Sequence, residues 1–241
     1  MRQLAEQAFP FEACGLIAAK GRKTHLISCE NISDDPRNNF QISHLKWNEV
    51  VEELGMEVVG VWHSHVNEPA MPSVADKMGC ELTALPWFIT AIYQNEVGVF
   101  THTAPELLTP EGFTLDYEGR PYVFGVMDCY SIVREYLKRE HDIALDFKGE
   151  CRIPDWVKKG HNFFVDNYAE QGFERLSSGV EPKPGDLFLI QVTSRHPDHI
   201  AVYVGDDMIL HHQHGRLSCK TVYGGFWHAR TTHHLRHTSK C

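Results

Sequence analysis

Short apolar runs and helical spacing alternate over the first hundred residues of the chain. Apolar runs bounded by turn residues are typical of buried strands, and apolar residues three or four apart are typical of helices. In chain order, the pattern predicts a helix at 2–8, a strand within 10–19, its hairpin partner at 23–29, a helix at 43–54, a strand at 58–65, a helix at 73–83, and strands at 87–93 and 97–101. The first half is therefore predicted to mix helices and strands.

The segment 104–118 interrupts this pattern. It contains two prolines, one glycine and four acidic residues with little periodicity, which indicates a linker or an extended domain edge. We place the boundary near Gly119, so the expected domains are 1–103 and 119–241, joined by 104–118.

A different order of elements is predicted beyond residue 119. Apolar positions at helical spacing follow Cys129, and segment 155–177 is also predicted to be helical. A strand at 186–192 precedes a hairpin whose arms are 199–205 and 208–212. The remaining tail, 227–241, is polar and rich in histidine, so we expect a frayed, solvated terminus without a function.

The strand at 58–65 ends in two histidines that could bind a metal. His63 and His65 point to the same side because alternate residues of a strand share a face. Ser73 suits the N-cap of the next helix, which places Asp76 in its first turn. Two imidazoles and a carboxylate around an open fourth position are typical of catalytic zinc sites. With 16 histidines in the chain, however, the two-histidine pattern alone could arise by chance.

Glu12 precedes a predicted strand that could neighbour the histidine strand. Taken alone, it fits an ordinary surface carboxylate at the start of a strand. A carboxylate close to a metal-bound water could instead take its proton and pass it to a leaving amine.

Residues 1 to about 103 resemble the JAMM (MPN-type) metalloproteases. The matching residues are Pro10, Glu12, Cys14, Gly15, Leu16, His63, Ser64, His65, Ser73 and Asp76. The resemblance implies an α/β domain with a mixed sheet and flanking helices. It further implies Zn²⁺ held by His63, His65 and Asp76, with Glu12 as general acid/base and Ser73 supporting the oxyanion or the bound water. This family cuts isopeptide and other amide bonds, so the substrate stays open.

Cys129 lies at the start of its predicted helix, where the helix dipole favours a thiolate. Taken alone, a free cysteine is typical of a small buried residue. His199 begins one arm of the predicted hairpin and His211 ends the other, so the two are expected to be neighbours. A thiol, a histidine to take its proton and a polar group to orient that histidine form the set that nucleophilic catalysis requires. Adjacent strand residues point oppositely, so His211 rather than His212 is expected to face inward.

Residues from about 119 to 230 resemble the NlpC-type cysteine peptidases. The matching residues are Tyr122, Asp128, Cys129, Gly185, Asp186, His199 to Gly205, and His211. The resemblance implies a papain-like α+β fold with an antiparallel sheet and, as substrates, the peptide stems of bacterial peptidoglycan. Tyr130 and the short gap between Tyr122 and Cys129 depart from the usual family pattern, which leaves the substrate preference open.

The order of the two domains resembles a family of tail tip proteins of lambda-like bacteriophages. That resemblance implies synthesis in the host cytoplasm, other tail tip proteins as partners, and action in the host periplasm if the virion carries the protein there. A rival interpretation is an assembly or structural protein whose peptidase folds serve as binding scaffolds.

Composition and charge argue against several other classes of protein. The net charge of −9 gives no basic surface for nucleic acid, and the chain has no apolar run long enough to span a membrane. The N-terminus lacks the apolar core of a secretory signal. Seven scattered cysteines without a CxxC pair indicate reduced thiols rather than a disulfide framework.

Overall fold

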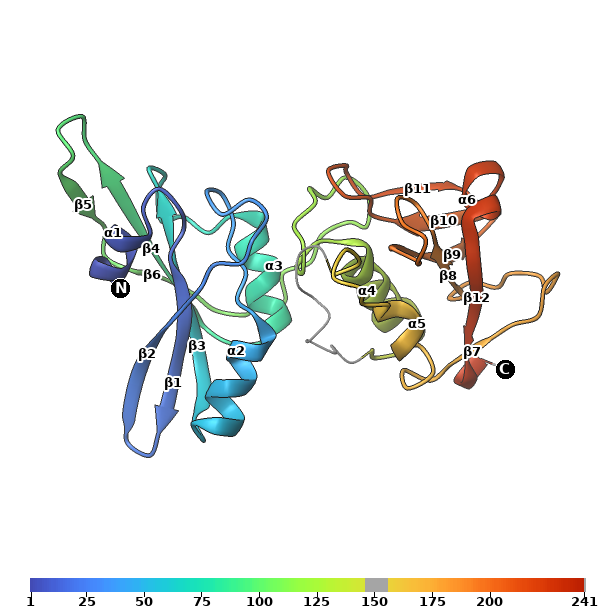
Figure 1. The fold of residues 1–241 in the computed structure, drawn as a ribbon, viewed down its shortest axis with the longest axis horizontal. Helices are drawn as coiled ribbons and strands as arrows, with labels where there is room; N and C mark the ends of the chain where they lie inside the picture. The colour runs from blue at the N-terminus through green and yellow to red at the C-terminus, as the bar shows by residue number, and fades with distance from the viewer. Residues whose placement is uncertain (146–155, 241) are drawn as a thin grey trace. The chain divides into compact units, whose positions relative to one another are not determined.

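The computed structural model describes residues 1–145 and 156–240. Residue contacts divide them into two compact units, the first running from Met1 to Thr114 and the second beginning at Leu115 (Figure 1). Each unit has its own sheet and its own hydrophobic core.

The first unit is built on a mixed six-stranded sheet. The strand order is β2-β1-β3-β4-β5, and β6 also pairs with β4 (Figure 1). β3 and β4 are parallel and are connected by α3, whereas the other pairs are antiparallel. The elements are α1 (Arg2–Ala8), β1 (Cys14–Lys20), β2 (Lys23–Cys29), α2 (His44–Asn48), the π-helix η1 (Glu49–Glu53), β3 (Glu57–Val66), α3 (Val74–Thr83), β4 (Trp87–Gln94), β5 (Phe100–His102) and β6 (Glu106–Leu108).

Close backbone packing holds β1 between β2 and β3. At Gly15, a Cβ atom would lie 2.1 Å from the carbonyl oxygen of Ile27 and 2.4 Å from the indole nitrogen of Trp62. Only glycine fits at those distances. The strand that carries His63 and His65 is therefore fixed against β1 by sterics as well as by its ladder of hydrogen bonds.

Most predicted elements of this unit are present, with three differences. The helix expected at 43–54 begins at His44 as predicted but continues as the π-helix η1. The strand expected at 97–101 is shifted to β5, because a turn closed by Gly98 donating to Asn95 occupies its first half. Segment 104–118 includes the short strand β6.

An antiparallel six-stranded sheet forms the second unit. Its order is β11-β10-β9-β8-β12-β7 (Figure 1). The elements are α4 (Cys129–His141), α5 (Phe163–Asn167), β7 (Phe173–Arg175), β8 (Leu187–Ile190), β9 (His199–Gly205), β10 (Met208–His211), β11 (Cys219–Val222), α6 (Gly225–Arg230), β12 (Thr231–His237) and the 3₁₀ turn η3 (Thr238–Lys240). The predicted fold class, a mixed-sheet α/β domain followed by an α+β domain with an antiparallel sheet, is confirmed.

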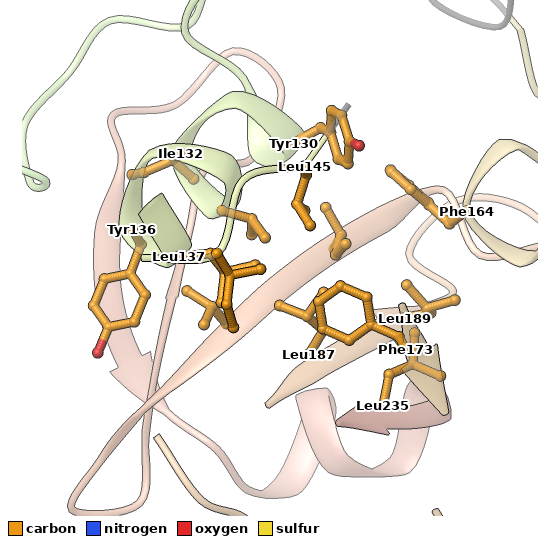
Figure 2. Packing of buried hydrophobic residues seen from close by; sticks show 14 of the residues in the cluster. Tyr130, Ile132, Tyr136, Leu137, Leu145, Phe164, Phe173, Leu187, Leu189 and Leu235 are labelled. Carbon is orange, nitrogen blue, oxygen red and sulfur yellow. The ribbon is translucent and has the colours of Figure 1, made fainter. Parts of the chain in front are cut away.

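The second sheet is covered on both faces. On one face, Leu187, Leu189 and their neighbours pack against Leu137 of α4, and Figure 2 shows these side chains in one layer. On the other face, Phe188 and the residues around it pack against Trp227 of α6. Alternate residues of β8, β9 and β10 therefore contribute to different cores.

Two secondary-structure predictions for this unit are wrong. Residues 156–177 do not form one helix: a five-residue helix, α5, is followed by β7, and Gly160 and Gly172 adopt positive φ, which ends helical geometry. Residue 155 lies outside the described part. The tail is not frayed either, because β12 is paired on both edges and Leu235 within it is fully buried.

Candidate active sites

A His-His-Asp cluster lies at the end of β3 in the first unit. His63 and His65 share a face of the strand as predicted, and Asp76 projects from the first turn of α3. The ring nitrogens Nε2 of His63 and His65 are 3.2 Å apart. His63 Nε2 lies 3.1 Å from Asp76 Oδ1, and His65 Nε2 lies 3.2 Å from Asp76 Oδ2. Three donor atoms therefore converge on one point.

Ser73 holds Asp76 in place through a capping box. Its hydroxyl oxygen accepts a hydrogen bond of 3.1 Å from the Asp76 backbone N–H, and its own N–H donates to Asp76 Oδ2 at 2.8 Å. The sequence prediction of Ser73 as N-cap is confirmed. Its further role toward an oxyanion or a water stays a prediction.

Contacts behind the two histidines fix their rings. His65 Nδ1 donates to the carbonyl oxygen of Pro69 at 2.7 Å, which leaves Nε2 free to face the cluster. The ring of His63 is stacked on Phe40, with centroids 4.4 Å apart, and meets Trp87 edge to face. His63 Nδ1 is buried and has no hydrogen-bond partner among the described residues. Aromatic packing therefore replaces a polar anchor for this ring.

The electrostatics of the cluster favour bound positive charge. Burial alone would raise the pKa of Asp76, but His63 together with hydrogen bonds from His63, His65 and Ser73 holds it well below its usual range. Burial lowers the pKa of His63, so its nitrogen keeps a lone pair. Two imidazole nitrogens facing a carboxylate at this separation fit a metal ion, which would satisfy all three donors.

Glu12 is buried beside this cluster. Cys14 of β1 lies opposite His63 in the antiparallel pair, so Glu12, two residues earlier, comes to the level of His65. Burial raises the pKa of the Glu12 carboxyl to about 8, although the nearby His65 partly opposes the shift. A surface position for Glu12 is thus excluded, since its side chain is 5% exposed.

Sequence reasoning missed the residue that positions Glu12. The Ser64 hydroxyl accepts a hydrogen bond of 2.9 Å from the Ala13 N–H, and the Ser64 N–H donates to the Ala13 carbonyl at 2.9 Å. These bonds clamp the residue next to Glu12 onto β3. A polar residue between two histidines in an otherwise apolar strand was the available signal.

The second unit carries the predicted thiol at a helix start. Cys129 is the first residue of α4, and Asp128 is its N-cap, accepting hydrogen bonds from the N–H groups of Tyr130 and Ser131. The thiol is half-buried and packs against the core shared by α4 and the sheet. Its pairing with the His199 ring stays a prediction.

The two histidines predicted to be neighbours in this unit lie within hydrogen-bonding distance of each other. His199 Nε2 and His211 Nδ1 are 3.0 Å apart, and both side chains are buried. Trp227 covers both rings, with its centroid 4.5 Å from that of His211. Burial lowers the pKa of His199 to about 3 and that of His211 to about 4, so both rings are neutral at neutral pH.

The expectation that only one of His211 and His212 faces inward is wrong. Both are buried, at 1% and 0% exposure. The strand ends at His211, and His212 turns beneath Tyr122 while its Nε2 donates to the carbonyl of Arg216 at 3.1 Å. Both faces of the sheet are covered, so side chains that point to opposite faces can both be buried.

Comparisons with known proteins agree with the two-unit architecture. Residues 1–103 match the family described as prokaryotic homologs of the JAB domain, and residues 119–236 match the NlpC/P60 family. The matches define a protein with a JAB-type N-terminal domain and an NlpC/P60-type C-terminal domain.

Two relatives that match most of the chain identify its family. It is 32% identical over 235 residues to the tail tip assembly protein K of Escherichia phage N15, covering 97% of this chain and 90% of that protein. It is 29% identical over 185 residues to the protein of the same name from Escherichia phage lambda, covering 77% of this chain and 84% of that protein. The chain belongs to the tail tip assembly protein K family.

Solved structures give weaker matches. A solution structure of a Desulfitobacterium hafniense protein has a TM-score of 0.31 and 23% identity, covering 42% of this chain and 82% of that one. A crystal structure of an NlpC/P60 family protein from Bacillus cereus has a TM-score of 0.33 and 10% identity, covering 98% of this chain and 66% of that one. Within the described residues, no helix is long and apolar enough to cross a bilayer.

Proposed function

We propose that this protein is a two-site peptidase of a phage tail tip. Its C-terminal domain is a cysteine endopeptidase acting on peptidoglycan stem peptides, and its N-terminal domain is a zinc-dependent amide hydrolase. It would be made in the host cytoplasm, assemble with other tail tip proteins and, when carried by the virion, act in the host periplasm.

In the C-terminal domain, Cys129 is the proposed nucleophile. Its thiol proton passes to His199 as the sulfur attacks the stem amide carbonyl, and backbone N–H groups near Cys129 stabilise the oxyanion. His199 then returns the proton to the leaving amine, and water hydrolyses the thioester. His211 orients His199 throughout.

The observation that carries this proposal is the buried His199–His211 pair at 3.0 Å. Desolvation keeps His199 neutral, which is the form that accepts a proton. Because α4 packs against β9 and β10, the helix that begins at Cys129 belongs to the same small core as the pair.

In the N-terminal domain, His63, His65 and Asp76 would hold Zn²⁺, since two imidazoles and a carboxylate suit this ion. When bound, the ion would polarise the scissile carbonyl and a water. Glu12 would take and return the proton, because a pKa of about 8 lies close to neutral pH. Ser73 would support the oxyanion beside Asp76.

Digestion of purified peptidoglycan tests the cysteine site. We expect wild-type protein to release stem fragments detectable by mass spectrometry, and Cys129→Ala to release at least about 10³-fold less. The matched control Cys29→Ala changes a thiol of the first domain, and we expect it to retain activity. Equal release by wild type and Cys129→Ala would contradict the proposal.

An assembly role is the second candidate, favoured by the names of the N15 and lambda relatives. In that case one or both peptidase folds serve as binding scaffolds. Phages that carry Cys129→Ala or lack the whole protein separate the two. Normal tails with impaired entry in Cys129→Ala favour the peptidase, whereas a Cys129→Ala phage that behaves like wild type, while tails are absent without the protein, favours the scaffold.

A further inference from the structure

Strand β11 brings a hydroxyl group to the far side of His211. In the β10–β11 pair, His211 lies opposite Cys219, and Thr221 is its diagonal neighbour. Thr221 Oγ1 is 3.1 Å from His211 Nε2, whereas Cys219 Sγ is 3.8 Å from the same nitrogen. His211 Nδ1 faces His199, so both nitrogens of His211 have a partner. Thr221, His211 and His199 thus form a continuous chain of hydrogen-bonding groups.

The number of protons on each ring fixes which group donates and which accepts in this row of hydrogen bonds. A neutral imidazole carries one N–H, which lies on Nδ1 or on Nε2. Once His199 is protonated, both of its nitrogens are donors, so His211 Nδ1 must accept from His199 Nε2. The single proton of His211 then lies on Nε2 and needs an acceptor. Thr221 Oγ1 is in place to accept it, and the sulfur of Cys219 is a weaker acceptor at longer range.

We propose that Thr221 is a positioning residue that stabilises protonated His199 by accepting the hydrogen bond from His211 Nε2. The inference rests on the proposed function, in which His199 receives the proton of Cys129. Thr221 contacts neither substrate nor sulfur in this scheme. It acts through His211, by selecting the arrangement of protons that an imidazolium at His199 requires.

Replacement by valine removes the acceptor and keeps the shape. In Thr221→Val, protonation of His199 would leave the buried His211 N–H without an oxygen partner, which disfavours the ion pair of thiolate and imidazolium. We expect the population of that ion pair to fall about tenfold. Thr221→Ser keeps the hydroxyl and should restore it.

The test measures alkylation of Cys129 by iodoacetamide against pH, on the full chain, with Cys129 identified by peptide mass spectrometry. The pKa of about 3 describes the His199 ring beside an uncharged thiol, whereas a thiolate formed at Cys129 by proton transfer to the ring would stabilise the imidazolium and offset its desolvation. We therefore expect the wild-type rate to stay on a plateau at mildly acidic pH. We expect the plateau to fall about tenfold in Thr221→Val and in Thr221→Ala, and to return in Thr221→Ser. Cys219→Ala, which removes the other neighbour of the same nitrogen, should retain it.

Two outcomes overturn the inference in different ways. A wild-type plateau that is unchanged in folded Thr221→Val or Thr221→Ala overturns the role of Thr221 alone and leaves the proposed peptidase intact. A wild-type Cys129 that titrates as an isolated thiol, without a plateau, overturns the pairing with His199 and therefore the proposed cysteine site together with this inference. Thermal melting of each variant shows that it is folded.

Discussion

The N-terminal and C-terminal sites both contain a pair of buried histidines, but only the first pair shares a carboxylate. Asp76 lies within 3.2 Å of the Nε2 atoms of His63 and His65. In the second site, His199 faces another imidazole, and the next polar partners are the hydroxyl of Thr221 and a thiol. Both sites are therefore buried, and they differ in that only the first pair of histidines faces a carboxylate.

This difference explains why the pKa of His65 is raised and the pKa of His199 is lowered. Burial penalises the charged form of every one of these rings. For His65, hydrogen bonds to Asp76 and to the Pro69 carbonyl outweigh that penalty and raise the pKa to about 9. For His199, the imidazoles of His211 and His212 add to the effect of burial, and the pKa falls to about 3. The first site attracts a cation, whereas the second keeps a neutral base.

The largest expected effect is the loss of metal from the first site. Asp76→Ala removes both a ligand and the negative charge that offsets the histidines, so we expect zinc affinity to fall more than about 100-fold, beyond what loss of an outer partner costs. Competition with a chromogenic chelator measures the affinity. His25→Ala, an exposed histidine on β2, should bind like wild type; unchanged affinity in Asp76→Ala would place the metal elsewhere.

Acid should destabilise the second domain. In the unfolded protein the His199 ring binds a proton below pH 6.5, whereas in the folded protein it does so only below about pH 3. The free energy of unfolding therefore falls as the pH drops through this window. At pH 5 the loss from this ring is about 2 kcal/mol relative to pH 7. Chemical denaturation at both pH values measures it, and His199→Gln should reduce the difference. Equal pH dependence in both proteins would contradict the buried neutral ring.

A smaller effect is expected at the clamp that positions Glu12. Ser64→Ala leaves the buried Ala13 N–H without its acceptor, which costs about 1–3 kcal/mol. Urea unfolding measures the change. Ser28→Ala, on the exposed edge strand β2, is the matched control and should cost less than about 0.5 kcal/mol. Equal costs would show that Ser64 does not hold β1 to β3.

The smallest effect concerns the stacked ring of Phe40. Phe40→Leu keeps an apolar contact but removes the flat surface that orients His63, so we expect zinc affinity to fall only severalfold, consistent with the modest energy of an aromatic pair. Isothermal titration with zinc would detect this. A loss as large as that of Asp76→Ala would mean that Phe40 shapes the whole site.

Both domains contain site residues whose placement could be predicted from the sequence. The strand with His63 and His65 and the helix cap at Ser73 follow from spacing within a short segment, because local periodicity sets which side chains share a face. The placement of His199 and His211 follows from a tight turn between adjacent strands. Such local geometry can be predicted from the sequence.

Long-range partners could not be predicted in this way. The polar segment 231–237 enters the sheet because His234 and Arg236 pair with the buried carboxylate of Asp186, whose pKa their hydrogen bonds lower to about 2 against the effect of burial. These partners lie about fifty residues apart, and nothing in the tail itself indicates them. Thr221 and Trp227 contact His211 from the next strand, β11, and from the helix after it, α6, so these contacts depend on how the elements pack rather than on spacing within one segment.

The two proposed reaction centres should work independently of each other, and one panel of variants tests this directly. Zinc content and release of peptidoglycan stem fragments are measured on the same preparations of wild type, His63→Ala and Cys129→Ala. We expect His63→Ala to lose zinc and still release fragments, and Cys129→Ala to keep zinc and release none. Loss of both readouts from either single substitution, in a folded protein, would contradict the account.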